Sequence, residues 1–79
     1  MNKEELEKVV YLLKRREICD SIIMMLIESK DCKLSGNYRN GTKSFSYVLT
    51  SEDRLSLQEH FYKTIDDINE ELKELKYYD

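Results

Sequence analysis

The spacing of apolar residues changes twice along this chain, and this feature most restricts its fold. Up to about residue 30 they recur every three or four positions, between about residues 32 and 49 they alternate, and over about residues 51–77 the longer spacing returns. A period near 3.6 is typical of an amphipathic helix, and a period of two is typical of a strand with one buried face. The sequence therefore predicts a single α+β domain over residues 1–79, in the order helix, two-stranded antiparallel β-hairpin, helix.

The first predicted helix covers about residues 3–30. Asn2 has the position of an N-cap, with Glu5 three residues later, and the acids of the first turn suit the positive end of the helix dipole. In the first half of this helix we expect one buried face, formed by Leu6, Val9, Val10 and Leu13.

The second half of this helix is apolar on nearly all sides. A helix with that pattern must be covered on nearly all sides, and a second helix with one hairpin covers only part of it. A 79-residue domain also has a small core of its own. We therefore expect a homo-oligomer, most simply a dimer. Its predicted interface residues are Ile18, Ile22, Ile23, Met24, Met25, Leu26 and Ile27.

The alternating segment contains Asn40-Gly41, a strong signal for a hairpin with a type I′ turn. If these are the turn residues, Gly36 lies opposite Phe45 and the side chains sort onto two faces. The apolar face contains Cys32, Leu34, Gly36, Tyr38, Phe45, Tyr47 and Leu49. The polar face contains Lys33, Ser35, Asn37, Arg39, Thr42, Ser44, Ser46 and Val48. A register shifted by one residue would mix the two sets, so we expect the apolar face to be buried and the polar face to be exposed.

The second predicted helix covers about residues 51–77. Thr50 has the position of its N-cap, and Asp53 has the N3 position of a capping box. A narrow apolar seam with spacings of three and four follows: Leu57, Phe61, Ile65, Ile68, Leu72 and Leu75. This seam predicts that the two helices lie antiparallel with coiled-coil-like packing.

The sequence offers no set of residues that is typical of catalysis, a cofactor or a metal. Cys19 and Cys32 lie among apolar residues, which favours buried, reduced thiols, and they are too few for a disulfide framework or a zinc site. His60 lies beside the second seam, where packing or solvation is the common role. No apolar run approaches the ~20 residues that span a bilayer, and the first residues are acidic rather than basic. We expect a cytoplasmic protein that is not an enzyme.

Charge is distributed unevenly along the chain. Residues 33–50 contain three cations and no acid, whereas residues 51–79 contain nine acids and four cations. The hairpin is therefore the predicted site for a partner or ligand, through Lys33, Asn37, Tyr38, Arg39, Thr42, Lys43 and Ser44. With a net charge of −3, the chain is a poor candidate for binding a phosphate backbone, so nucleic acid is not the partner we expect.

These observations favour a small oligomeric binding protein that blocks a protein partner. The chain has no Ala, although Ala is the best helix former, and this suggests AT-rich coding, as in a low-GC bacterium or one of its phages or mobile elements. The composition concerns origin only; the preferred interpretation is a phage or mobile-element accessory with an anti-defence role. A first alternative is sequestration of a small nucleotide-like anion between subunits by the cationic hairpin. A second alternative is a DNA-binding regulator.

Overall fold

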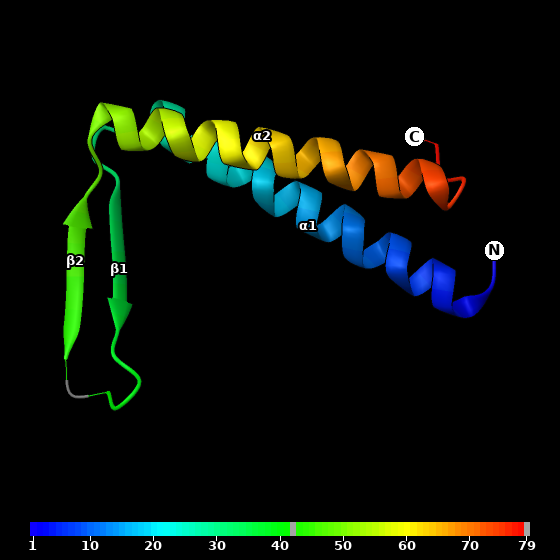
Figure 1. Ribbon diagram of the computed structural model, residues 1–79, viewed down its shortest axis with the longest axis horizontal. Coiled ribbons are helices and arrows are strands. Elements are labelled where there is room, and N and C mark those ends of the chain that lie inside the picture. Colours follow the sequence, from blue (N-terminus) through cyan, green and yellow to red (C-terminus); the bar gives the residue numbers. More distant parts are fainter. Residues whose placement is uncertain (42, 79) are drawn as a thin grey trace.

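The computed structural model describes residues 1–41 and 43–78. It contains helix α1 (Lys3–Glu28), strands β1 (Lys33–Asn37) and β2 (Ser44–Val48), and helix α2 (Ser51–Glu74). This is the predicted order, with helix ends slightly earlier than expected. The two helices lie side by side, and the hairpin turns away from them at one end, which gives the molecule an L-shaped outline (Figure 1). Both termini lie at the other end of the helix pair.

Both predicted helix N-caps are confirmed. The Asn2 side-chain oxygen accepts a hydrogen bond from the Glu5 backbone N–H at 2.8 Å. At the second helix, the Thr50 hydroxyl accepts from the Asp53 N–H at 3.1 Å, and the Asp53 carboxylate accepts from the Thr50 N–H at 3.0 Å. These bonds satisfy backbone N–H groups that have no acceptor within the helix. They explain why the helices begin directly after Asn2 and Thr50.

Helix α2 ends in a turn that the sequence pattern does not predict. The Tyr77 N–H donates to the Leu72 carbonyl, and the Lys76 N–H donates to the Lys73 carbonyl, each at 2.9 Å. Lys76 has a φ of 60°, the left-handed conformation that usually selects glycine at this position. The turn folds Tyr77 back against the core, which explains why the helix stops before the predicted residue 77.

The core lies between the two antiparallel helices. Val9 and Leu12, near the start of α1, pack with Ile68 and Leu72, near the end of α2, and each of the four is only 2% exposed. The predicted face of the first helix is therefore partly wrong, because Leu6 and Val10 are exposed.

The face of α1 that is covered within the chain recurs at spacings of four and three. Its members are Glu5, Val9, Leu12, Arg16, Cys19, Ile23 and Leu26, all of them buried or half-buried. The matching seam of α2 is as predicted, since Ile68 and Leu72 are buried and its other four members are half-buried. Regular spacings of this kind keep one stripe of each helix in contact over its length.

The hairpin has the predicted register. Gly36 pairs with Phe45, Leu34 with Tyr47, and Asn37 with Ser44. The Phe45 ring lies over Gly36, where an added Cβ atom would come within 2.9 Å of it. Gly36 is therefore needed for a close approach of the ring to the backbone.

The turn differs from the predicted type I′. The Gly41 N–H donates to the Tyr38 carbonyl at 2.9 Å, and the Tyr38 N–H donates to the Lys43 carbonyl at 3.0 Å. Gly41 has a φ of 71°, but Asn40 lacks the positive φ that a type I′ turn requires at both central residues. The connection is thus a longer loop, closed by the Tyr38–Lys43 pair, and its member Thr42 lies outside the described residues.

The expected burial of the hairpin's apolar face is confirmed only at its base, where Cys32 is buried and Leu49 is half-buried, and is wrong for its other side chains. Phe45 and Tyr47 are 48% and 49% exposed, and all five residues of β2 are exposed. The cause is geometric: the strands leave the helix pair, and within the described residues no strand runs alongside a helix. Both faces of the sheet therefore meet solvent, although only one of them is polar.

Candidate functional site

The hairpin joins the helices at an elbow, formed by the end of α1, the base of the hairpin and the start of α2. Arg54 holds it together: its Nε donates to the Leu26 carbonyl at 2.8 Å, and one terminal nitrogen donates to the Ser29 carbonyl at 2.6 Å. Leu26 belongs to the last turn of α1 and Ser29 is its C-cap, at the helix end where carbonyl acceptors lack partners. This last turn contains no basic residue. Arg54 thus supplies the positive charge that the C-terminus of α1 lacks.

A second polar contact ties the hairpin to α2. The Tyr47 hydroxyl donates to the Asp53 carboxylate at 2.8 Å, alongside the Asp53 capping bonds. Hydrogen bonds from the Thr50 backbone, the Tyr47 hydroxyl and the Thr50 side chain lower the pKa of Asp53. The hydrogen bond to Asp53 and its negative charge raise the pKa of Tyr47. The contact is therefore strongest with a neutral phenol and an ionised carboxylate.

The inner side of the elbow contains an apolar cavity of about 350 Å³. Residues of α1, the hairpin base and α2 line it: Ile22, Met25, Leu26, Ser29, Asp31, Cys32, Lys33, Leu34, Leu49, Leu57 and Phe61. Cys32 is buried there, as expected, and its thiol lies 3.6 Å from the Met25 carbonyl oxygen. Sequence reasoning missed this cavity because its lining comes from three elements whose relative placement the pattern does not specify.

The predicted partner site on the hairpin is divided between two faces. Asn37 and Ser44 face each other on the polar side, beside an open hollow of about 420 Å³. Tyr38 lies with the apolar residues, and its ring meets the Phe45 ring edge to face at a centroid distance of 6.4 Å. The structure therefore brings Asn37 together with Ser44, and Tyr38 together with Phe45, but separates the two pairs.

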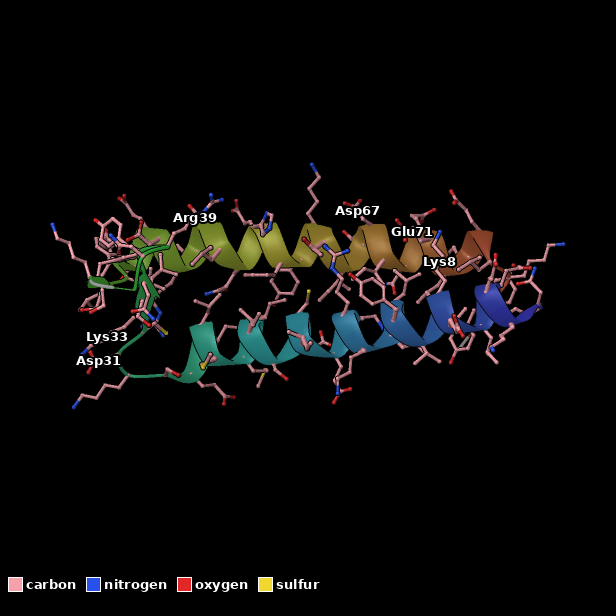
Figure 2. The ribbon with its side chains drawn as sticks, turned by 90° about the horizontal axis from the view of Figure 1, so that it is seen from below. Lys8, Asp31, Lys33, Arg39, Asp67 and Glu71 are labelled. Atoms are coloured by element: carbon pink, nitrogen blue, oxygen red, sulfur yellow. The ribbon has the colours of Figure 1, made fainter. Side chains whose placement is uncertain are left out.

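The three hairpin cations do not all lie together. Lys43 lies at the outer end of the hairpin, as Arg39 does, since its carbonyl accepts a hydrogen bond from the Tyr38 N–H. Lys33 begins β1 at the elbow end, whereas Arg39 lies in the connecting loop, about 20 Å farther along an extended strand. Figure 2 labels Lys33 beside Asp31, on the opposite side of the hairpin from Arg39. The described residues that line the polar hollow include none of these cations. This arrangement separates Lys33 from the other two cations and leaves the polar hollow without a lining cation.

The predicted oligomer interface divides into buried and exposed residues. Ile23 and Leu26 are buried within the single chain, and Ile22 is half-buried. The other four are about half exposed: Ile18, Met24, Met25 and Ile27. Because these four surround the helix, the apolar surface available to another molecule has more than one side.

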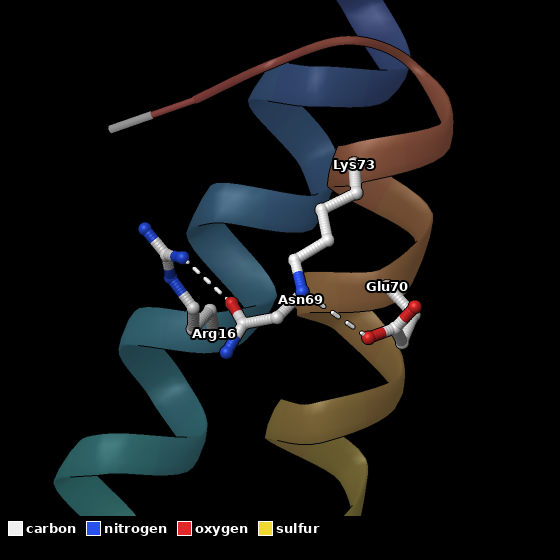
Figure 3. A network of polar contacts seen from close by, with 4 residues as sticks. All are labelled: Arg16, Asn69, Glu70 and Lys73. Atoms are coloured by element: carbon white, nitrogen blue, oxygen red, sulfur yellow. Dashed lines mark hydrogen bonds and ion pairs between the residues drawn. The ribbon is translucent and has the colours of Figure 1, made fainter.

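One polar pair lies inside the contact between the helices (Figure 3). An Arg16 guanidinium nitrogen donates to the Asn69 side-chain oxygen at 2.8 Å in a partly buried position. Nearby, Lys73 and Glu70 form an exposed pair at 3.4 Å, of a kind that contributes little to stability. The Arg16–Asn69 bond favours one alignment of the two helices, since a shift of one helix along the other would break it.

Residues that carry chemistry remain dispersed. His60 is exposed, with its ring edge to face on Phe61, and Cys19 is buried. Over residues 1–41 and 43–78, no three His, Cys, Asp or Glu residues group closely enough to hold a metal ion. Among the same residues, neither helix combines the length and apolar character needed to cross a membrane.

The comparisons with known proteins add no assignment to these surfaces. Neither a protein-family model, nor a curated protein, nor a solved structure matches the chain.

Proposed function

We propose that this chain is a non-catalytic, oligomeric binding protein that inhibits a protein partner by occupying the partner's surface. The observation that carries the proposal is the projecting hairpin, which extends from the end of a helix pair and exposes its polar face and the outer residues Tyr38 and Arg39. A binding loop held by a rigid scaffold is a common design for recognition. Arg54 and the Tyr47–Asp53 contact fix the base of this arm.

The chemistry of the arm favours a protein over a small anion or a nucleic acid. Tyr38 exposes more than half of its surface near the outer end of the arm, and aromatic residues are enriched in protein interfaces. Arg39 lies at the outer end, where a cation meets an approaching partner first. A partner with an acidic surface therefore fits this arm best, in keeping with the proposed anti-defence role of a phage or mobile-element accessory.

The experiment is quantitative capture of partners from extracts of the source cells by three forms of the immobilised protein. The wild type is compared with Arg39→Glu/Lys43→Glu in the hairpin and with Asp67→Lys/Glu74→Lys on the exposed side of α2. Asp67 lies far from the hairpin (Figure 2). Each double variant changes the net charge by four, in opposite directions, so it also controls for charge on another surface.

We expect the hairpin double variant to lose at least tenfold in partner affinity, because a hydrogen bond to a charged group contributes roughly 1.5–3 kcal/mol. The α2 double variant should bind as the wild type does. Loss of binding in the α2 variant with retention in the hairpin variant would refute the proposed site. Retention of nucleic acid in place of protein would refute the proposed partner class.

A further inference from the structure

The chain exposes more surface than a compact protein of its mass. Its accessible surface is 6639 Å², whereas compact monomers of 9.5 kDa expose about 5,000 Å². Its radius of gyration is 16.2 Å, against about 12 Å for a compact chain of this length. The excess of about 1,600 Å² lies in the range that one subunit of an obligate dimer buries.

The hairpin is the part of the chain whose stability depends most on burial by another surface. A two-stranded hairpin alone is marginally stable in water, and stability requires a third strand or a covered apolar face. Leu34, Phe45 and Tyr47 share such a face, and each is about half exposed. The Phe45 ring lies close over Gly36, so its other side is the one that another surface can contact.

This face continues into the elbow and along α1. Leu34 lines the elbow cavity together with Ile22 and Met25 of α1. Ile18 and Tyr11 lie seven and fourteen residues before Met25, which places them on the same side of the helix. We call this surface the inner face; its members are Tyr11, Ile18, Ile22, Met25, Leu34, Phe45 and Tyr47.

We propose that a second copy of this chain covers the inner face, with the hairpin of each copy packed against the elbow of the other. The inference rests on the self-association in the proposed function and assigns its side. A twofold dimer uses the same surface on both copies, so that surface must offer both a recess and a projection. The elbow cavity is the recess, and the Phe45 and Tyr47 rings on the arm are the projection. A second copy also matches the excess surface in size.

Two adjacent methionines provide a matched test. Met25 belongs to the inner face, whereas Met24 points to the other flank of α1, since successive helical residues are turned by about 100°. Their exposed fractions are similar, 58% and 50%, and a lysine at either position has the same effect on charge and helix propensity. Phe45→Lys tests the same face from the hairpin, and Ser46→Lys on the polar side of β2 is its control.

The measurement is the mass in solution by light scattering over a concentration series, with circular dichroism to confirm that each variant remains folded. The wild type should show twice 9.5 kDa at micromolar concentration. Met25→Lys and Phe45→Lys should raise the dissociation constant about thirtyfold or more, as removal of a central interface residue does. Met24→Lys and Ser46→Lys should leave it within a few-fold.

Each other outcome has a definite meaning. A wild-type mass of 9.5 kDa at all concentrations would refute both self-association and this inference. The proposed partner site at the loop does not depend on that result. A dimer weakened by Met24→Lys and not by Met25→Lys would keep self-association but overturn the inner face. Equal weakening by both methionine variants would overturn it too, as would a dimer that none of the four variants weakens.

Discussion

The helix pair and the hairpin both form where the sequence predicts them, yet only the helix pair has a buried apolar seam. Ile68 and Leu72 are 2% exposed between α1 and α2, whereas Phe45 and Tyr47 are about half exposed on a hairpin of correct register. A helix seam finds its complement on the other helix of the same chain. The hairpin face has no complement within the described residues, because the elbow directs it away from both helices. The spacing of apolar residues thus indicates which side of a helix or strand is to be buried. It does not indicate which other element or molecule buries that side.

The largest expected effect contrasts the two regions directly. Ile68→Ala should lower the free energy of unfolding by about 2–4 kcal/mol, because it leaves a cavity in the only continuous core of the described chain. In solutions dilute enough to be monomeric, Phe45→Ala should lower it by less than about 1 kcal/mol, since the ring is already half exposed. Urea unfolding at low protein concentration measures both. Equal losses would show that the hairpin is packed as tightly as the helix pair.

The next effect concerns the elbow that separates the regions. Arg54→Met keeps most of the side-chain volume but removes the donors to the Leu26 and Ser29 carbonyls, and should lower stability by about 2 kcal/mol. Lys63→Met, at an exposed position of α2, is the control and should change stability by less than about 0.5 kcal/mol. Thermal unfolding of the two variants measures the difference. A loss of similar size in both would mean that Arg54 does not hold the end of α1.

A smaller effect is expected at the loop. Gly41 has a φ of 71°, so Gly41→Val should lower stability by about 1–2 kcal/mol through backbone strain alone, because nothing lies within 4 Å of an added Cβ atom. Gly41→Asn should lower it less, since asparagine tolerates this conformation. Urea unfolding is again the measurement, and no difference between valine and asparagine would contradict the positive φ.

The smallest effect is the pH dependence of the contact between hairpin and α2. The pKa of Asp53 is lowered on folding, so its contribution to stability is present above its ordinary pKa near 4 and is lost as pH falls through the folded pKa. The pKa of Tyr47 is raised, so its contribution is present below its ordinary pKa near 10 and is lost as pH rises through the folded pKa.

Phenolate absorbance should therefore show Tyr47 ionising above its ordinary pKa, and Asp53→Asn should lower the pKa of Tyr47 toward that ordinary value. Tyr47→Phe should remove that tyrosine from the titration. An unchanged titration in Asp53→Asn would contradict the hydrogen bond between these side chains.

Local signals were sufficient for much of this fold. Asn2, Thr50 and Asp53 begin the helices as predicted, and the alternation around Gly36 and Phe45 specifies the strand register. These features depend on residues close together in sequence, or on a period shared by two neighbouring strands. For the same reason Cys19 and Cys32 were correctly expected to be buried.

Features that depend on distant residues were missed. The covered stripe of α1 includes Glu5 and Arg16, so a search for apolar residues alone chose Leu6 and Val10, which are exposed. No spacing indicates that Arg54 caps a helix that ended more than twenty residues earlier. The direction of the hairpin follows from such contacts at the elbow, and therefore so does the exposure of its apolar face.

Hydrogen–deuterium exchange of the peptide covering residues 33–48 tests most directly whether a second copy buries one face of the hairpin. The exchange is followed over a dilution series, with a helix peptide as reference. If a second copy covers the inner face, hairpin amides will exchange slowly at high concentration and quickly at low concentration. The residues around Ile68 will change less, because their cover comes from the same chain. Hairpin exchange that does not depend on concentration would contradict a cover supplied by another copy.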